Sequence, residues 1–202
     1  MSTVADRAQI LLELHEAPEI LVLANVWDVV SAQVVAATEG VKALASASHS
    51  IAATFGYEDG ENIPLELHLD MVRRIVEAVE LPVSMDLEAG YGDAGKTARR
   101  AIAIGAAGGN LEDEMMPLAE AVAAVAAVVR AGEAEGVPFV LNARTDAFLK
   151  AGDRPRGEVL AEAIERGRAF LEAGAPVVFV PGAVDRGEIE QLVAASASAS
   201  SA

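Results

Sequence analysis

The sequence predicts an α/β fold in which helices cover a parallel sheet. Short apolar runs alternate with segments of helical periodicity along most of the 202 residues, and this alternation is typical of strands joined by helical crossovers. The apolar runs are almost uninterrupted, which indicates strands buried on both faces. The length and an apolar fraction of 52% are enough for one large domain with a sizeable core.

Six apolar or β-branched runs are the predicted strands. In chain order they are Leu21–Trp27, Ala43–Ser48, Pro82–Glu88, Gly109–Glu112, Pro138–Arg144 and Pro176–Val180. An amino-terminal helix from about Thr3 to Glu16 precedes the first of them. The repeating unit is therefore strand, loop, helix.

The segments between the strands have recognisable helix ends. Asp28 is a candidate N-cap of a helix that stops at Gly40. Pro64 and Pro117 stand at plausible first helical positions, and Asp93 precedes another helical segment. The helices expected after the first are 28–40, 64–81, 93–106, 117–136, 156–174 and 185–195. Two histidines, His15 and His68, lie on these helices and are expected at the surface.

The number of units predicts an incomplete barrel. A closed (β/α)₈ barrel needs about 250 residues, and this chain supplies six of the eight units. We expect a TIM-type barrel that is either truncated or open; an open six-stranded α/β sheet is the alternative. The single domain would span residues 1–195, and residues 196–202 form a low-complexity Ser/Ala tail. Unpaired outer strands would favour association with another chain, so we expect a homo-oligomer.

The charge balance argues against nucleic-acid binding. The chain has 15 Lys and Arg against 31 Asp and Glu, a net charge of −16, and such a surface repels phosphate backbones. Cysteine is absent, which removes thiol chemistry and fits a reducing cytoplasm. The amino terminus lacks the pattern of a signal peptide, and no apolar run reaches the roughly 18 residues of a membrane span. We therefore expect a cytoplasmic protein without a nucleic-acid or membrane partner.

Polar pairs end three neighbouring predicted strands. Residues i and i+2 of a strand face the same side, and the carboxyl ends of parallel strands are where active sites lie. Converging carboxylates repel one another unless a cation lies among them. Oxygen ligands without cysteine favour Mg²⁺, with Mn²⁺ as the alternative. The pairs are Asp86 with Glu88, Asn110 with Glu112, and Asn142 with Arg144.

Four motifs carry a resemblance to a known family. The segments SHSIAATFGYEDGE, DLEAGYG, GGNLEDE and NARTDAF stand in the order and spacing of the isocitrate lyase and phosphoenolpyruvate mutase superfamily, which the chain resembles from about Leu21 to Pro181. The resemblance implies a (β/α)₈ barrel, of which the last two units are not visible here. It also implies a bound Mg²⁺, a 2-oxo acid or its enolate, and the making or breaking of C–C or P–C bonds.

The resemblance also assigns roles to individual residues. For the metal, Asp86 would be the direct ligand, Glu88 and Glu112 would hold metal-bound waters, and Asp59 would complete the shell and orient the reacting group. It implies Arg144 and Asp59 as catalytic residues, with Arg144 neutralising charge on the substrate. His49, near the end of the second predicted strand, is a third catalytic candidate as an acid, base or substrate contact, and polar packing is the alternative for it. The expected substrate-binding residues are Ser48, His49, Arg144, Asn142 and Trp27.

The loop after the fourth predicted strand departs from the family pattern. Isocitrate and methylisocitrate lyases carry a Lys-x-Cys-Gly-His loop there, whereas this chain has EDEMMPLAEAV. The difference argues against cysteine-dependent cleavage of isocitrate and favours a simpler reaction, such as decarboxylation of oxaloacetate. We therefore expect a Mg²⁺-dependent lyase that acts on a small 2-oxo or 2-hydroxy carboxylate. The alternative is a catalytically silent or truncated family member that binds a carboxylate.

Overall fold

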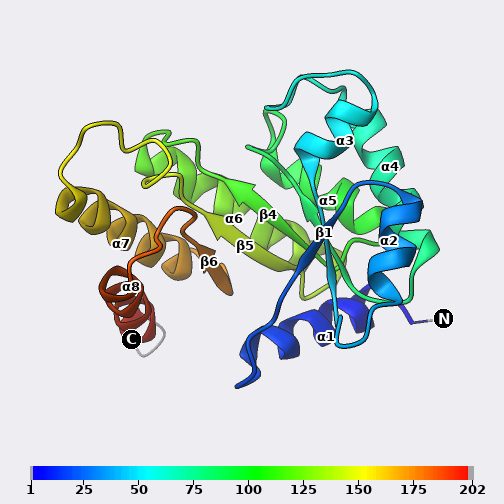
Figure 1. The fold of residues 1–202 in the computed structure, drawn as a ribbon, viewed down its shortest axis with the longest axis horizontal. Coiled ribbons are helices and arrows are strands. Elements are labelled where there is room, and N and C mark those ends of the chain that lie inside the picture. Colours follow the sequence, from blue (N-terminus) through cyan, green and yellow to red (C-terminus); the bar gives the residue numbers. More distant parts are fainter. Residues whose placement is uncertain (1, 200–202) are drawn as a thin grey trace.

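A computed structural model describes residues 2–199 as one curved parallel sheet flanked by helices (Figure 1). The strands are β1 (Ala24–Val26), β2 (Leu44–Ser46), β3 (Val83–Asp86), β4 (Gly108–Glu112), β5 (Val140–Arg144) and β6 (Val177–Phe179). The helices are α1 (Val4–Glu16), α2 (Val29–Ala36), α3 (Ser48–Thr54), α4 (Leu65–Ala78), α5 (Ala94–Ala103), α6 (Leu118–Glu135), α7 (Arg156–Glu172) and α8 (Arg186–Ala199).

The sheet follows the chain order from β1 to β6, and every neighbouring pair is parallel. The prediction of six strand–helix units in a parallel α/β fold is confirmed. The sheet curves as a barrel does but does not close: within residues 2–199, β1 pairs only with β2 and β6 only with β5. Figure 1 shows α7 and α8 beyond β6, and α1 beneath the sheet.

Side-chain caps decide where several helices begin. The Asp28 carboxylate accepts a hydrogen bond from the Ser31 amide at 2.6 Å, so this predicted N-cap is confirmed. Asp93, which was expected to precede a helix, caps α5 through the Lys96 amide at 2.9 Å. Pro64 and Pro117 occupy the N-cap position itself, one residue before the first helical residue. The left-handed Gly136, with φ 66°, ends α6.

The core requires glycine where β4 approaches its neighbours. A Cβ on Gly108 would lie 2.5 Å from the Val140 carbonyl oxygen and 2.9 Å from Leu11 Cδ2. Leu11, on α1, is completely buried, so α1 packs directly on the start of β4 and β5. This packing fixes the position of the central strands, whose carboxyl ends carry the polar residues.

Several predicted boundaries differ from the structure. All strands except β4, which begins one residue earlier than predicted, are shorter than the apolar runs. The first spans Ala24–Val26 rather than Leu21–Trp27, because hydrophobicity continues beyond the hydrogen-bonded pairing. The helix after Asp28 ends at Ala36, before Gly40. Helix α3 was not expected, since Ala47 at its N-cap makes no side-chain hydrogen bond. Helix α8 continues to Ala199, into the predicted Ser/Ala tail; residues 200–202 lie outside the described residues.

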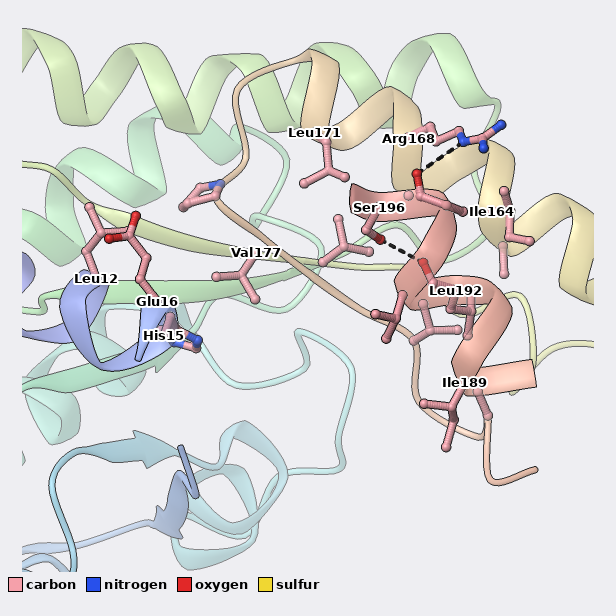
Figure 2. A pocket seen from close by; sticks show the side chains of 18 residues that line it. Leu12, His15, Glu16, Ile164, Arg168, Leu171, Val177, Ile189, Leu192 and Ser196 are labelled. Carbon is pink, nitrogen blue, oxygen red and sulfur yellow. Dashed lines mark hydrogen bonds between the residues drawn. The ribbon is translucent and has the colours of Figure 1, made fainter. Parts of the chain in front are cut away.

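A cavity of about 760 Å³ lies between α1, β6, α7 and α8 (Figure 2). Its walls are mainly apolar, with Leu12 on α1 facing Val177 on β6 and Leu192 on α8. None of the site residues expected from the sequence lines it, so this hollow is a feature of the open sheet rather than of the polar strand ends. Among the described residues, no helix is long and apolar enough to cross a membrane.

Candidate active site

A ladder of polar side chains crosses three strands at the site. Asp86 on β3 lies in register with Asn110 on β4, which lies in register with Asn142 on β5. The Asn142 amide donates to Asn110 Oδ1 at 3.1 Å, and the Asn110 amide lies 3.4 Å from Asp86 Oδ1. The register thus brings two of the expected pairs onto the same face as Asp86.

Asp86 is held from the other side by the end of β2. The Ser48 hydroxyl donates to Asp86 Oδ2 at 2.6 Å, and the Ser48 amide lies 3.3 Å from the same oxygen. The Asp86 amide in turn donates to the Ser46 hydroxyl at 2.9 Å. The structure therefore places Ser48, expected as a contact of the substrate carboxylate, against the expected metal ligand.

Glu88 combines burial with an uncommon backbone conformation. Its φ is 53°, a left-handed conformation that costs free energy in a residue other than glycine. The residue is only 5% exposed, and its Oε1 atom is buried without a hydrogen-bond partner in the described structure. Burial raises the pKa of Glu88 to about 7, and the charges of Asp86 and Asp59 add to the increase.

Glu112 and Arg144 end β4 and β5 side by side. Arg144 Nη1 lies 2.5 Å from Glu112 Oε1, and Arg144 Nε lies 2.8 Å from Asp146 Oδ1. Burial raises the pKa of Glu112 to about 8 although Arg144 pulls in the other direction. The pKa of Glu112 stays raised because the Arg144 guanidinium is shared between Glu112 and Asp146, and because Asp86 and Glu88 add further negative charge.

The remaining expected residues lie at the exposed rim. Asp59 is exposed on the loop before α4 but is close enough for its charge to raise the pKa of Glu88. His49 is exposed, with its ring beside the Ser50 hydroxyl. Trp27 is 42% exposed at the end of β1. No hydrogen bond links these three side chains to the central carboxylates within the described chain.

Sequence reasoning missed a second layer beside Glu88. The Tyr91 hydroxyl lies 3.0 Å from His68 Nδ1, and the Tyr91 amide donates to Glu61 Oε1 at 2.6 Å. The expectation that His68 is a surface residue is wrong: it is completely buried, and burial lowers its pKa to about 4. Its spacing from Val72 and Ile75 places it on the apolar stripe of α4, a signal that was available in the sequence.

The residues fit a hard divalent cation. The donors are all oxygen atoms, Glu88 keeps a buried oxygen without a partner in the described structure, and burial together with neighbouring negative charge raises the pKa of two carboxyl groups. No three carboxylate or imidazole groups among the described residues converge closely enough to ligate one ion together.

Comparisons with known proteins show which family this chain belongs to. A protein-family model described as phosphoenolpyruvate phosphomutase matches residues 11–200. An oxaloacetate decarboxylase of Rhodopseudomonas palustris is 33% identical over 150 residues, which are 71% of this chain and 52% of that enzyme. The chain thus spans about half the length of this curated relative.

Solved structures resemble the whole described fold. A protein of Burkholderia cenocepacia assigned as a phosphonomutase superimposes with a TM-score of 0.89 at 40% identity, over 96% of this chain and 80% of that one. An oxaloacetate acetylhydrolase, solved with its product oxalate, superimposes with a TM-score of 0.83 at 27% identity, over 96% of this chain and 70% of that one.

Proposed function

The chain belongs to the phosphoenolpyruvate phosphomutase family, and from this premise we propose that it is a Mg²⁺-dependent lyase acting on a small 2-oxo carboxylate. The family includes carbon–carbon lyases and mutases. The observation that carries the proposal is the group of Asp86, Glu88 and Glu112 at the carboxyl ends of β3 and β4, where burial and mutual repulsion raise the pKa of both glutamates. Such a group of negative charges is costly unless a cation compensates it.

Four carboxylates are the proposed holders of the metal ion. Asp86 is the proposed direct ligand; Glu88, Glu112 and Asp59 are proposed to act through water. Mn²⁺ would suit the same oxygen donors. A divalent cation supplies positive charge for the negative oxygen of an enolate.

Arg144 is proposed to meet the substrate carboxylate. Its side chain keeps 21% of its surface exposed while Glu112 and Asp146 fix two of its nitrogen atoms. Ser48, Asn142 and Trp27 are proposed to complete the substrate pocket. The exposed His49 is proposed as a substrate contact or proton donor, because it directly follows Ser48, which contacts Asp86.

Oxaloacetate is the proposed substrate. A relative from R. palustris is named an oxaloacetate decarboxylase, and a structural relative is named an oxaloacetate acetylhydrolase. In decarboxylation the bond between C3 and the departing carboxylate breaks and CO₂ leaves. The electron pair of the broken bond stays on the substrate and forms the enolate of pyruvate, which then takes a proton from solvent at C3. The short loop after β4 carries no cysteine, histidine or lysine, so proton delivery by water suits this site.

A second candidate function is carboxylate binding without turnover. The loop after β4, which carries no cysteine, histidine or lysine as a proton donor, favours it. It uses the same residues, so a binding measurement alone does not separate the two functions. An assay of product formation does separate them.

The test is metal-dependent decarboxylation of oxaloacetate. We expect pyruvate formation that requires Mg²⁺ or Mn²⁺ and is abolished by Asp86→Asn, since the amide removes the ligand charge and little volume. The matched control is Asp153→Asn, at an exposed loop position, which should retain full activity. Full activity in Asp86→Asn would refute the assignment, and carboxylate binding without pyruvate formation would favour the second candidate.

A further inference from the structure

A buried carboxylate joins the turns that follow β4 and β5. Asp113 Oδ1 accepts hydrogen bonds from the Met115 amide and from the Asp146 amide, each at 3.0 Å. The side chain is only 2% exposed. A single oxygen atom of Asp113 therefore fixes the backbone on two neighbouring loops of the candidate active site.

Arg166 on α7 holds the other oxygen of this carboxylate. Its Nη1 atom lies 3.1 Å from Asp113 Oδ2, and both Nη atoms lie 3.1 Å from the Met116 carbonyl oxygen. The guanidinium side chain is 7% exposed. A planar fork of donors is suited to such a joint contact with a carboxylate and a carbonyl group.

The network continues to the residue proposed to meet the substrate. Asp146, whose backbone is tied to Asp113, accepts a hydrogen bond from Arg144 Nε at 2.8 Å, and Arg144 Nη1 reaches Glu112 at 2.5 Å. An unbroken series of contacts thus leads from α7 to the end of β4. Each step is a hydrogen bond between groups of low exposure.

Stability alone is a poor reason for this arrangement. Removing two charges from water costs free energy that a buried ion pair recovers only with good geometry, and apolar residues often replace such pairs without loss. The turn beside it is itself strained, because Glu114 and Met115 have φ values of 45° and 58°. Contacts of this kind are better suited to holding a defined geometry.

We propose that Asp113 and Arg166 are positioning residues that hold Arg144 against Glu112 and set where its guanidinium group meets the substrate. The part of this inference that concerns substrate rests on the proposed function. The placement of Arg144 does not, and it is measurable in the protein without turnover.

The test is the solvent exchange of the Arg144 Nε proton, measured by nuclear magnetic resonance on the full chain. The signal is assigned by its disappearance in Arg144→Lys. Arg166→Lys keeps the positive charge but loses the fork, so we expect the Arg144 proton to exchange about tenfold faster as its hydrogen bond to Asp146 loosens. Asp113→Asn is expected to give the same result from the other side of the pair.

The matched control is Arg156→Lys on the same helix. Arg156 pairs with the Glu188 carboxylate at 2.6 Å and donates to the Gly182 carbonyl group at 3.2 Å, whereas Arg166 pairs with two carboxylates, Asp113 and Glu162. In the described structure Arg156 makes no hydrogen bond to Asp113, Asp146 or Arg144. It should destabilise the fold without changing the exchange of the Arg144 proton. An unchanged exchange rate of the Arg144 Nε proton in Arg166→Lys, or an equal change in Arg156→Lys, would overturn the proposal. If Arg166→Lys does not fold, the same measurement on Asp113→Asn decides.

Activity provides a separate readout. In the decarboxylation assay, Arg166→Lys should raise the KM for oxaloacetate about tenfold with a smaller change in kcat, because a misplaced guanidinium weakens carboxylate binding. A change confined to kcat would contradict this part of the inference. Absence of turnover in the unmodified protein would refute the proposed function and leave the resonance experiment as the test of Arg144 placement.

Discussion

Glu88 combines a left-handed backbone conformation, a buried side chain and a raised pKa. It follows β3 in a left-handed conformation, with a buried oxygen atom that lacks a partner in the described structure. Its position two residues after Asp86 predicted a shared face, but the left-handed turn was not visible in the sequence. A site that holds an acid in this way is preorganised for a positive partner.

The two raised glutamate pKa values predict that metal-free protein loses stability as the pH rises. A carboxyl group whose folded pKa lies above its unfolded value contributes stability below the unfolded pKa, and this contribution is lost as the pH rises through the folded pKa. For Glu88 and Glu112 those folded pKa values are about 7 and about 8. We expect the Tm in EDTA to fall between pH 6.5 and about 8, and Mg²⁺ to reduce the fall.

The window above pH 6.5 avoids the opposite contribution of His68. Its folded pKa is lowered from 6.5 to about 4, so its contribution is present above 6.5 and is lost as the pH decreases toward 4. Glu88→Gln should remove part of the fall at high pH, whereas Glu77→Gln, at an exposed helix position, should not. An equal slope in Glu88→Gln and the unmodified protein would contradict the assignment.

The contact between Tyr91 and His68 predicts a selective loss of stability. Tyr91→Phe removes the hydroxyl that lies 3.0 Å from His68 Nδ1, and leaves a fully buried ring without that partner. We expect a decrease of about 1–3 kcal/mol in the free energy of unfolding, measured by urea denaturation. The same change at the exposed Tyr57 should cost less than about 0.5 kcal/mol; equal effects would show that the buried contact is unimportant.

At the scale of elements, the close approach of β4 to β5 and α1 gives a clear prediction. Gly108→Ala places a Cβ 2.5 Å from the Val140 carbonyl oxygen, so we expect a loss of about 1–3 kcal/mol in unfolding free energy. The matched change is Gly157→Ala in the first turn of α7, where nothing lies within 4 Å of the new atom. Alanine favours a helix over glycine by up to about 1 kcal/mol, so calorimetry should show an unchanged or higher Tm for Gly157→Ala. A tolerated Gly108→Ala would disprove the packing argument.

The sequence predicted elements where a local signal exists. Asp28 was recognisable as an N-cap because a short polar side chain precedes a periodic segment, and it forms the capping hydrogen bond. Asp93 likewise marked the start of a helical segment and caps it. Helix α3 was missed because Ala47 has no capping side chain. Strand ends were overestimated because apolar character extends into segments, such as residues 21–23, that pair with no strand.

The candidate site was predictable to the extent that strand periodicity determines it. The register between β4 and β5 brings Glu112 opposite Arg144, as alternation in the two strands predicts, whereas Glu88 lies beyond β3 in a left-handed conformation that alternation does not describe. Contacts between distant segments had no signal of this kind. Asp113, Asp146 and Arg166 meet through loop geometry and helix packing, which only the folded chain shows.

At the scale of the whole molecule, the open sheet predicts self-association. Exposed apolar side chains flank both unpaired edges, with Val22 72% exposed before β1 and Phe179 43% exposed on β6. We expect sedimentation equilibrium to show a mass above that of the single chain, and Phe179→Lys to reduce it. Ile10→Lys, a change at an exposed apolar position on α1, should have no effect. A chain that is monomeric at all concentrations would contradict this expectation.

The central claim is that Asp86, Glu88 and Glu112 form a site for a divalent cation together with a 2-oxo carboxylate or its enolate. Thermal unfolding in EDTA, in Mg²⁺, in oxalate alone and in Mg²⁺ with oxalate, a mimic of the pyruvate enolate, tests it most directly. A ligand at 100 times its Kd stabilises the folded state by about 2.7 kcal/mol. We expect the largest rise in Tm when Mg²⁺ and oxalate are both present, and its loss in Asp86→Asn. A cooperative transition at the same Tm in all four solutions would contradict the account.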